Sequence, residues 1–132
     1  MRWCPLYDNG SSLCCYVNSE QLSKLLGNDK NRFEALVDSK SRSRIRIDGY
    51  KKNLPSHREV VAYLLKKYPE TKEICKNFLE RLTKEILHSL LEEYSMEILT
   101  QQKKELILRF LYRKIEILNE LLKEAEYSDA NE

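Results

Sequence analysis

The turn formed by Gly27, Asn28, Asp29 and Lys30 contains the residue types in this sequence that best suit anion binding. A glycine lets backbone N–H groups come close to a phosphodiester, and a helix that follows the turn presents its positive end to the negative charge. Gly27 permits that approach, and the Lys30 ammonium can contact a phosphate. The Asp29 carboxylate would repel a phosphate by roughly 1 kcal/mol at about 5 Å. The turn therefore predicts a weakened phosphate clamp.

Basic and aromatic side chains downstream of the turn extend this candidate nucleic-acid site. Arginine and lysine contact phosphates, and a tyrosine ring can stack on a base. We therefore predict a nucleic-acid-binding set made of Gly27, Asn28, Lys30, Arg32, Arg44, Arg46, Tyr50, Lys51 and Lys52. Each of these cations is also compatible with an ordinary solvated surface charge.

The charge of the chain is divided unequally between its two halves. Residues 1–68 contain 13 Lys and Arg against 7 Asp and Glu, a balance of +6, whereas residues 69–132 contain 10 against 14, a balance of −4. A basic half suits a polyanionic partner, and an acidic half suits a partner of a different kind. The asymmetry therefore favours two kinds of contact within one chain.

No set of residues in the sequence has the spacing of a catalytic or metal site. The four cysteines, Cys4, Cys14, Cys15 and Cys75, form no C-x-x-C pair, and neither histidine lies near them in the sequence. Zinc sites usually draw their ligands from such pairs. The sequence also contains no nucleotide-binding glycine loop and no nucleophile motif. We therefore expect no metal, no cofactor and no enzymatic activity.

The segments around the turn combine a strand-like and a helix-like pattern. Residues 13–17 form a short run of β-prone residues, which predicts a strand. Asn18 and Gln21 then have the spacing of a helix-capping box. Apolar residues recur at helical spacing on both sides of Gly27, as far as Val37. The turn is therefore expected to connect two short helices.

The segments that follow predict two further strands and a helix. Residues 44–48 alternate strictly between apolar and polar, which predicts a strand with Ile45 and Ile47 buried. Residues 59–64 fit either a strand or one face of a helix, because their apolar positions satisfy both periods. A helix is predicted from Pro69 onwards, since proline is favoured at the first helical position and acidic residues follow it.

This order of elements, with the residues around the turn, resembles a type I K-homology (KH) domain. The family's turn has an apolar pair, Gly-x-x-Gly, and then a basic and an apolar residue, which the chain matches at Leu25, Leu26, Gly27, Arg32 and Phe33. Lys30 replaces the second glycine. The resemblance implies an α+β fold, β-α-α-β-β-α, over residues 12–87, with residues 59–64 as a strand. It also implies a groove that clamps single-stranded RNA or DNA.

Residues 88–127 are predicted to form a C-terminal helical extension, because they contain neither Gly nor Pro. The apolar residues between positions 106 and 125 cover an arc of roughly 200° at about 100° per residue. The seam of a two-stranded coiled coil is much narrower, so this helix must bury two sides. We predict an interface with a protein partner, or with a second copy, at Ile107, Leu111, Ile115, Leu118 and Leu122.

Targeting signals are not evident in the sequence. It contains no run of about 18 apolar residues, and its first residues lack the apolar core of a signal peptide. The cysteine spacing indicates reduced thiols. These features predict an intracellular protein, in the cytoplasm or the nucleus, without a membrane partner.

These patterns together predict a non-enzymatic module with two binding surfaces. A basic KH-like face would bind single-stranded or structured RNA, and the C-terminal helices would bind a protein partner. Two alternatives stay open. One is a protein–protein interaction scaffold that does not bind RNA, and the other is a small, stably bound subunit of a ribonucleoprotein such as the ribosome.

Overall fold

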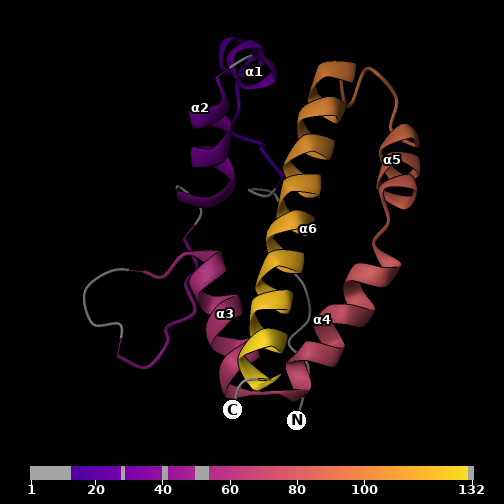
Figure 1. The fold of residues 1–132 in the computed structure, drawn as a ribbon. Helices are drawn as coiled ribbons and strands as arrows, with labels where there is room; N and C mark the ends of the chain where they lie inside the picture. The colour runs from indigo at the N-terminus through magenta and orange to yellow at the C-terminus, as the bar shows by residue number, and fades with distance from the viewer. Residues whose placement is uncertain (1–12, 28, 40–41, 50–53, 131–132) are drawn as a thin grey trace.

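The described part of the chain is built from helices, and the longest of them, α6, lies between the others (Figure 1). The computed structural model describes residues 13–27, 29–39, 42–49 and 54–130. In chain order, its elements are α1 (Ser19–Leu26), α2 (Lys30–Glu34), the π-helical turn η1 (Ala35–Ser39), α3 (His57–Lys67), α4 (Glu70–Arg81), α5 (Lys84–Glu92) and α6 (Gln101–Ala130). Helices α1 and α3 pack on one side of α6, and α4 and α5 follow each other along its other side.

The α+β fold expected from the KH resemblance is wrong, because none of the described residues belongs to a β-strand. Within the described ranges, a single isolated bridge pairs Arg42 with Ser56. The three predicted strands are instead a turn, an irregular segment and a helix. The predicted domain boundary between residues 87 and 88 falls inside α5.

The first predicted strand, residues 13–17, is a turn. Leu13 and Cys14 have positive φ angles of 52° and 62°, which take the backbone out of the extended region. The Lys103 ammonium on α6 donates hydrogen bonds to the carbonyl oxygens of Cys14, at 2.7 Å, and Val17, at 2.8 Å. A lysine from a distant helix therefore satisfies backbone acceptors that a strand would have offered to a sheet.

The second predicted strand, residues 44–48, is an irregular segment. Ile45 is exposed and Ile47 is half-buried, so the strict alternation does not correspond to a buried face. The segment is tied instead to α3, because the Asp48 carboxylate accepts a hydrogen bond from the Lys67 ammonium at 2.7 Å. This bond lowers the pKa of Asp48 and raises that of Lys67.

The third predicted strand, residues 59–64, is part of α3. Ser56 and Glu59 form a capping box at the start of this helix: the Ser56 hydroxyl accepts a hydrogen bond from the Glu59 N–H at 3.2 Å, and the Glu59 carboxylate accepts one from the Ser56 N–H at 2.6 Å. Val60 and Leu65 are buried on its inner face. The helical alternative for this segment is therefore the correct one, and the family resemblance selected the wrong one.

Two helix starts predicted from the sequence are confirmed. Asn18 and Gln21 form the expected capping box at the start of α1. The helix predicted from Pro69 onwards is α4, for which Pro69 is the N-cap residue. The chain then breaks at Leu82, and Thr83 caps a separate helix, α5, by accepting a hydrogen bond from a backbone N–H of its first turn.

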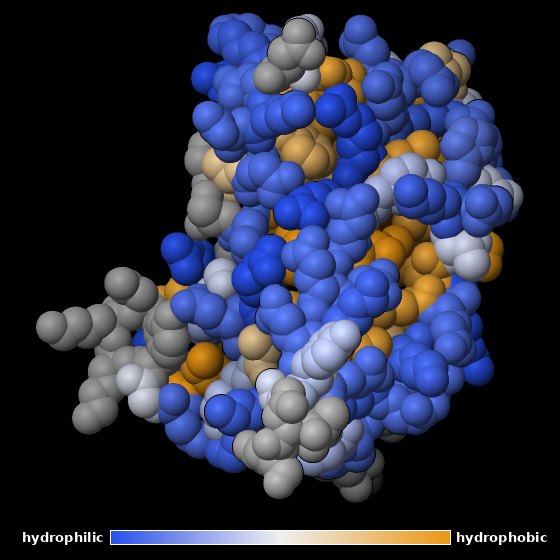
Figure 2. All heavy atoms as spheres, viewed as in Figure 1, coloured by the Kyte–Doolittle hydropathy of each residue, from blue (hydrophilic) through white to orange (hydrophobic). Residues whose placement is uncertain are grey.

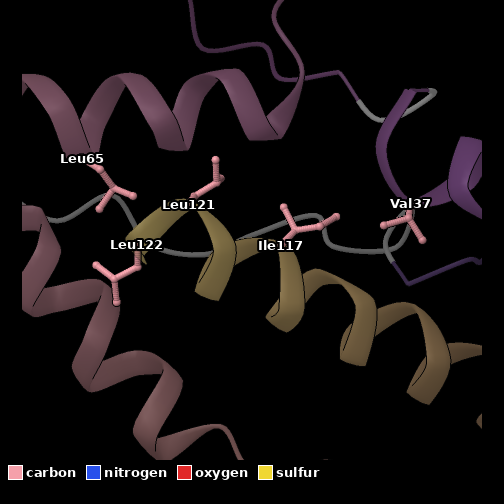
Figure 3. Packing of buried hydrophobic residues seen from close by; sticks show 5 residues of the cluster. All are labelled: Val37, Leu65, Ile117, Leu121 and Leu122. Carbon is pink, nitrogen blue, oxygen red and sulfur yellow. The ribbon is translucent and has the colours of Figure 1, made fainter. Parts of the chain in front are cut away.

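The core consists of two clusters, and both are built on α6. In one of them, Val37 of η1 and Leu65 of α3 pack with three residues of α6, namely Ile117, Leu121 and Leu122 (Figure 3). In the other, α1 packs on the first part of α6 through Leu22, Leu25 and Leu106. Because α4 and α5 also contact α6, the chain itself covers both sides of the wide apolar arc.

Arginines on α6 connect it to the N-terminal helices. The Arg109 guanidinium donates a hydrogen bond to the carbonyl oxygen of Leu26, the last residue of α1, at 2.9 Å. A cation at this position satisfies a carbonyl that the helix itself leaves unpaired. The Arg113 guanidinium lies 3.0 Å from the Glu34 carboxylate of α2 and 3.2 Å from that of Glu120. These contacts fix α1 and α2 against α6.

Among the residues that the structure describes, no helix combines the length and the apolar character that crossing a membrane requires. Three of the cysteines, Cys14, Cys15 and Cys75, are free thiols. Burial raises the pKa of Cys14 and of Cys75, which favours the protonated, less reactive form of both side chains.

The position of α6 in the core can be tested by shortening Leu106, which is fully buried. Leu106→Ala should lower the free energy of unfolding by about 2–5 kcal/mol, because the substitution leaves a cavity between α1 and α6. The control, Ile98→Ala at an exposed position, should change it by no more than about 0.5 kcal/mol. Urea unfolding followed by circular dichroism measures both, and equal effects would contradict this core.

Candidate interaction surface

The predicted phosphate clamp serves to start a helix. The Asp29 side chain caps α2 by accepting a hydrogen bond from the Arg32 N–H at 3.0 Å. Its carboxylate also pairs with the Arg32 guanidinium at 3.3 Å. Gly27 and Lys30 are exposed, whereas Asn28 lies outside the described residues. Asp29 is therefore a capping residue, and its carboxylate partly neutralises Arg32, one of the predicted phosphate ligands.

Arg44 and Arg46, two of the predicted nucleic-acid-binding residues, do not lie beside this turn. Arg44 and Arg46 are exposed, as predicted, but they lie in a segment that loops out beside α3, whereas the turn lies at the α1–α2 end of the molecule (Figure 1). Tyr50, Lys51 and Lys52 lie outside the described residues. The KH arrangement of this face is therefore wrong, because no sheet in the described structure brings the turn and the arginines to one groove. Binding of RNA by these residues stays a prediction.

The five predicted interface residues lie on the parts of α6 that the chain itself covers. Ile107 and Leu122 are buried, and Leu111, Ile115 and Leu118 are half-buried. Because neighbouring helices pack on both sides of α6, the wide apolar arc does not by itself require a second chain. The role of these residues as a partner interface stays a prediction.

A row of exposed apolar side chains lies instead on α4 and α5. Ile74 and Phe78 on α4, with Ile86 and Leu90 on α5, are each between 45% and 66% exposed. We call these four residues the α4–α5 flank. Single exposed apolar residues are common on proteins, but a contiguous row of large ones marks an interaction site.

On α4, the exposed apolar residues are placed beside inward-facing ones. Ile74 directly precedes Cys75, and Phe78 directly precedes Leu79. Cys75 and Leu79 are partly buried against the cluster of α3 and α6 residues. One residue along a helix is a rotation of about 100°, so the exposed pair lies to one side of the buried pair rather than opposite α6.

The same arrangement is repeated on α5. Ile86 directly precedes Leu87, which is buried, and Leu90 directly precedes Leu91, which is half-buried. Since α4 and α5 follow each other along α6 in the same direction (Figure 1), the same rotation takes both exposed pairs to the same side. The α4–α5 flank is therefore one continuous surface.

Further exposed apolar residues follow α5 along the chain. Tyr94, Met96 and Ile98 lie in the connection between α5 and α6, and each is more than half exposed. This connection is short and lacks glycine and proline. Its apolar content is therefore high for a segment that makes only a turn, which supports a role in binding.

Acidic residues border the flank at both of its ends. Glu70 and Glu73 lie in the first turn of α4, and Glu93 and Glu97 follow α5. Within the described residues, neither Glu93 nor Glu97 takes part in an ion pair, so their charges are open to a ligand. Arg81 supplies a positive charge between the two ends, at the end of α4. The ends of the surface are therefore negative.

A hollow of a different character lies on the other side of α4 and α5, where they meet α6. Figure 2 shows apolar residues in the space between these helices, bordered by polar ones. Part of this hollow has a volume of about 650 Å³ and is lined by α5 residues that include Glu85 and His88, and by Tyr112 of α6. The Tyr112 hydroxyl donates a hydrogen bond to the Lys84 carbonyl oxygen at 3.3 Å, which ties α6 to α5. Most of the residues that line this part of the hollow are charged or polar, whereas the α4–α5 flank presents four large apolar side chains, so the flank is the stronger candidate for binding a protein.

The sequence alone predicted a helix from Pro69 onwards but did not separate the exposed apolar residues of this region from the buried ones. The signal that identifies the flank is a repeated pair of adjacent apolar residues. The pairs are Ile74-Cys75, Phe78-Leu79, Ile86-Leu87 and Leu90-Leu91. Only one residue of each pair can face α6, so the other must face solvent or a ligand.

The structure also bears on metal chemistry. Among the described residues, no group of three or more His, Cys, Asp or Glu side chains has an arrangement that could hold a metal ion. His57 and His88 lie in different helices, on α3 and α5. The α4–α5 flank offers apolar contact from its exposed side chains, with acidic residues at its ends.

Matched substitutions on one helix distinguish flank residues from core residues. Ile86→Ser should lower the free energy of unfolding by less than about 1 kcal/mol, because its side chain is already half in water. Leu87→Ser, one position later and buried, should cost about 2–5 kcal/mol. Phe78→Ser and Leu79→Ser provide the same comparison on α4. Equal losses within each pair, measured by chemical unfolding, would mean that the flank is part of the core.

No protein-family model, no curated protein and no solved structure matches this chain. The α4–α5 flank, with its apolar centre and its acidic ends, is the main candidate site of this chain.

Proposed function

We propose that this protein is a non-enzymatic helical interaction module, whose α4–α5 flank binds a basic amphipathic helix of a partner protein. The observation that carries the proposal is the exposure of Ile74, Phe78, Ile86 and Leu90 along one side of two consecutive helices. Burying four such side chains is favourable, since each large apolar residue contributes about 1.5–3 kcal/mol when it is fully removed from water.

The shape of the flank suits a helix. Its anchors are spaced four residues apart within α4 and within α5, and they extend over a length on the order of 20 Å, at about 1.5 Å per residue. An amphipathic helix offers apolar anchors at the same spacing along one face. A partner helix that lies along α4 and α5 can therefore contact all four anchors at once.

The charges of the flank favour a basic partner over a second copy of this chain. A two-fold dimer would pair the flank with itself, in the parallel or the antiparallel sense, and in both senses the acidic residues at an end of one copy, Glu70 and Glu73 or Glu93 and Glu97, would lie near those at an end of the other. Four like charges would meet, and their repulsion opposes the contact. A helix with lysine or arginine near both of its ends meets the same carboxylates with attraction.

The free thiols support an intracellular setting for this interaction. Disulfides persist in oxidising compartments, and reduced cysteines are typical of the cytosol and the nucleus. Cys14 and Cys75 lie partly within the core and are unpaired. We therefore expect the partner helix to belong to a protein of the cytosol or the nucleus.

A synthetic peptide tests the proposal directly. The probe is an amphipathic helix of about 16 residues, roughly 24 Å long, with leucines along one face and lysines near both ends. Calorimetric titration of the full chain should detect binding that weakens as salt rises. The same peptide with glutamates in place of the lysines should bind about tenfold more weakly or worse.

The matched protein variants place the binding on the flank. Phe78→Ser combined with Ile86→Ser should weaken peptide binding at least about tenfold, whereas Tyr127→Ser, at an exposed aromatic residue of α6, should leave it unchanged. Equal binding by the flank variant, or equal binding of the acidic peptide, would refute the proposed partner. A stable dimer that dissociates when the flank is altered would identify a second copy as the occupant instead.

A further inference from the structure

A small cavity lies between η1, α3 and α6, on the opposite side of α6 from α5. Its volume is about 90 Å³, and by the same measure a single water needs about 10–15 Å³. The inner wall is apolar and is made by Val61 of α3 with Ile117, Leu118 and Leu121 of α6. The space is therefore large enough for several heavy atoms of a ligand, and its wall suits an alkyl group.

Charged side chains form the rest of the cavity lining. Arg58 of α3 uses its guanidinium to pair with Asp38 of η1 at 3.1 Å and with Glu120 of α6 at 3.7 Å. Arg58 thus engages both carboxylates at this site. His57 and Lys114 complete the polar lining.

Lys114 is the cation of this group that has no direct counter-ion. Within the described residues, no carboxylate lies within 4.0 Å of its ammonium, which instead lies 5.5 Å from the centre of the Phe110 ring. Burial, and the nearby positive Arg58, lower the pKa of Lys114, although Asp38 opposes this effect. Partial burial and Lys114 similarly lower the pKa of His57. A negative charge at this position would stabilise the protonated, positively charged form of both Lys114 and His57.

We infer that this cavity binds a small aliphatic monocarboxylate, whose carboxylate pairs with Lys114 and whose alkyl chain lies against Val61, Ile117, Leu118 and Leu121. A single negative charge matches the single unpaired cation. A phosphate dianion fits less well, because the Asp38 and Glu120 carboxylates are close by and would repel its second charge. This site is separate from the α4–α5 flank, so each can be tested without the other.

The probe for this site is sodium hexanoate, added to the full chain with carbon-13-labelled methyl groups. Hexanoate should shift the NMR signals of the Val61, Ile117, Leu118 and Leu121 methyls, and it should raise the pKa of His57 measured in the same titration. Lys114→Met keeps most of the apolar stem and removes the charge, so it should weaken binding about tenfold. Lys123→Met, at an exposed position of the same helix, should leave binding unchanged.

Two further measurements separate the carboxylate site from a merely apolar cavity. Hexan-1-ol has the same chain without the charge, and it should bind more weakly than hexanoate to the wild type and equally to the wild type and Lys114→Met. Leu118→Phe should fill the cavity and abolish hexanoate binding while Lys114 is retained. The inference is overturned if hexanoate leaves these methyl signals unmoved, if Lys114→Met binds it as well as the wild type does, or if hexan-1-ol binds equally well.

Discussion

The burial of α6 on two sides is the constraint on which the rest of this structure depends. Its apolar residues span too wide an arc for one neighbouring helix, so α1, η1 and α3 cover one side while α4 and α5 cover the other. Even a lysine, Lys104, is buried by this packing, and its ammonium lies 3.8 Å from the Glu92 carboxylate at the end of α5. A buried charge needs such a partner. The position of α5 therefore follows from polar as well as apolar requirements of α6.

This constraint also explains why an apolar flank is left over. Helices α4 and α5 carry adjacent apolar pairs, and the contact with α6 buries only one member of each pair. Ile74 and Phe78, with their counterparts on α5, consequently lie beside the contact rather than within it. Retaining large apolar residues in water carries an aggregation risk, and the acidic residues at both ends of the flank, such as Glu70 and Glu97, reduce that risk through charge repulsion between copies.

The sequence was sufficient to predict the helix starts that depend on local chemistry and insufficient for the rest of the fold. Asn18 and Gln21 specify a cap through their own side chains, so short-range reasoning found it. Strict alternation predicted a strand at residues 44–48, and the family resemblance predicted one at residues 59–64; both predictions are wrong. Residues 59–64 follow a local signal, the Ser56–Glu59 capping box, that the resemblance overrode. The conformation of residues 44–48 depends on tertiary contacts, such as the Lys67 bond to Asp48, that no local pattern encodes. The candidate site was missed for a related reason, since which member of an apolar pair faces inward depends on where α6 lies.

The central claim is that the α4–α5 flank is exposed to water in a folded helical protein. Solvent paramagnetic relaxation by a soluble gadolinium chelate, measured on methyl and aromatic NMR signals, tests this most directly. The account predicts strong broadening for Ile74, Phe78, Ile86 and Leu90, and sharp signals for the buried Leu87. Protection of the flank residues in the free monomer, or broadening of Leu87 equal to theirs, would contradict the account.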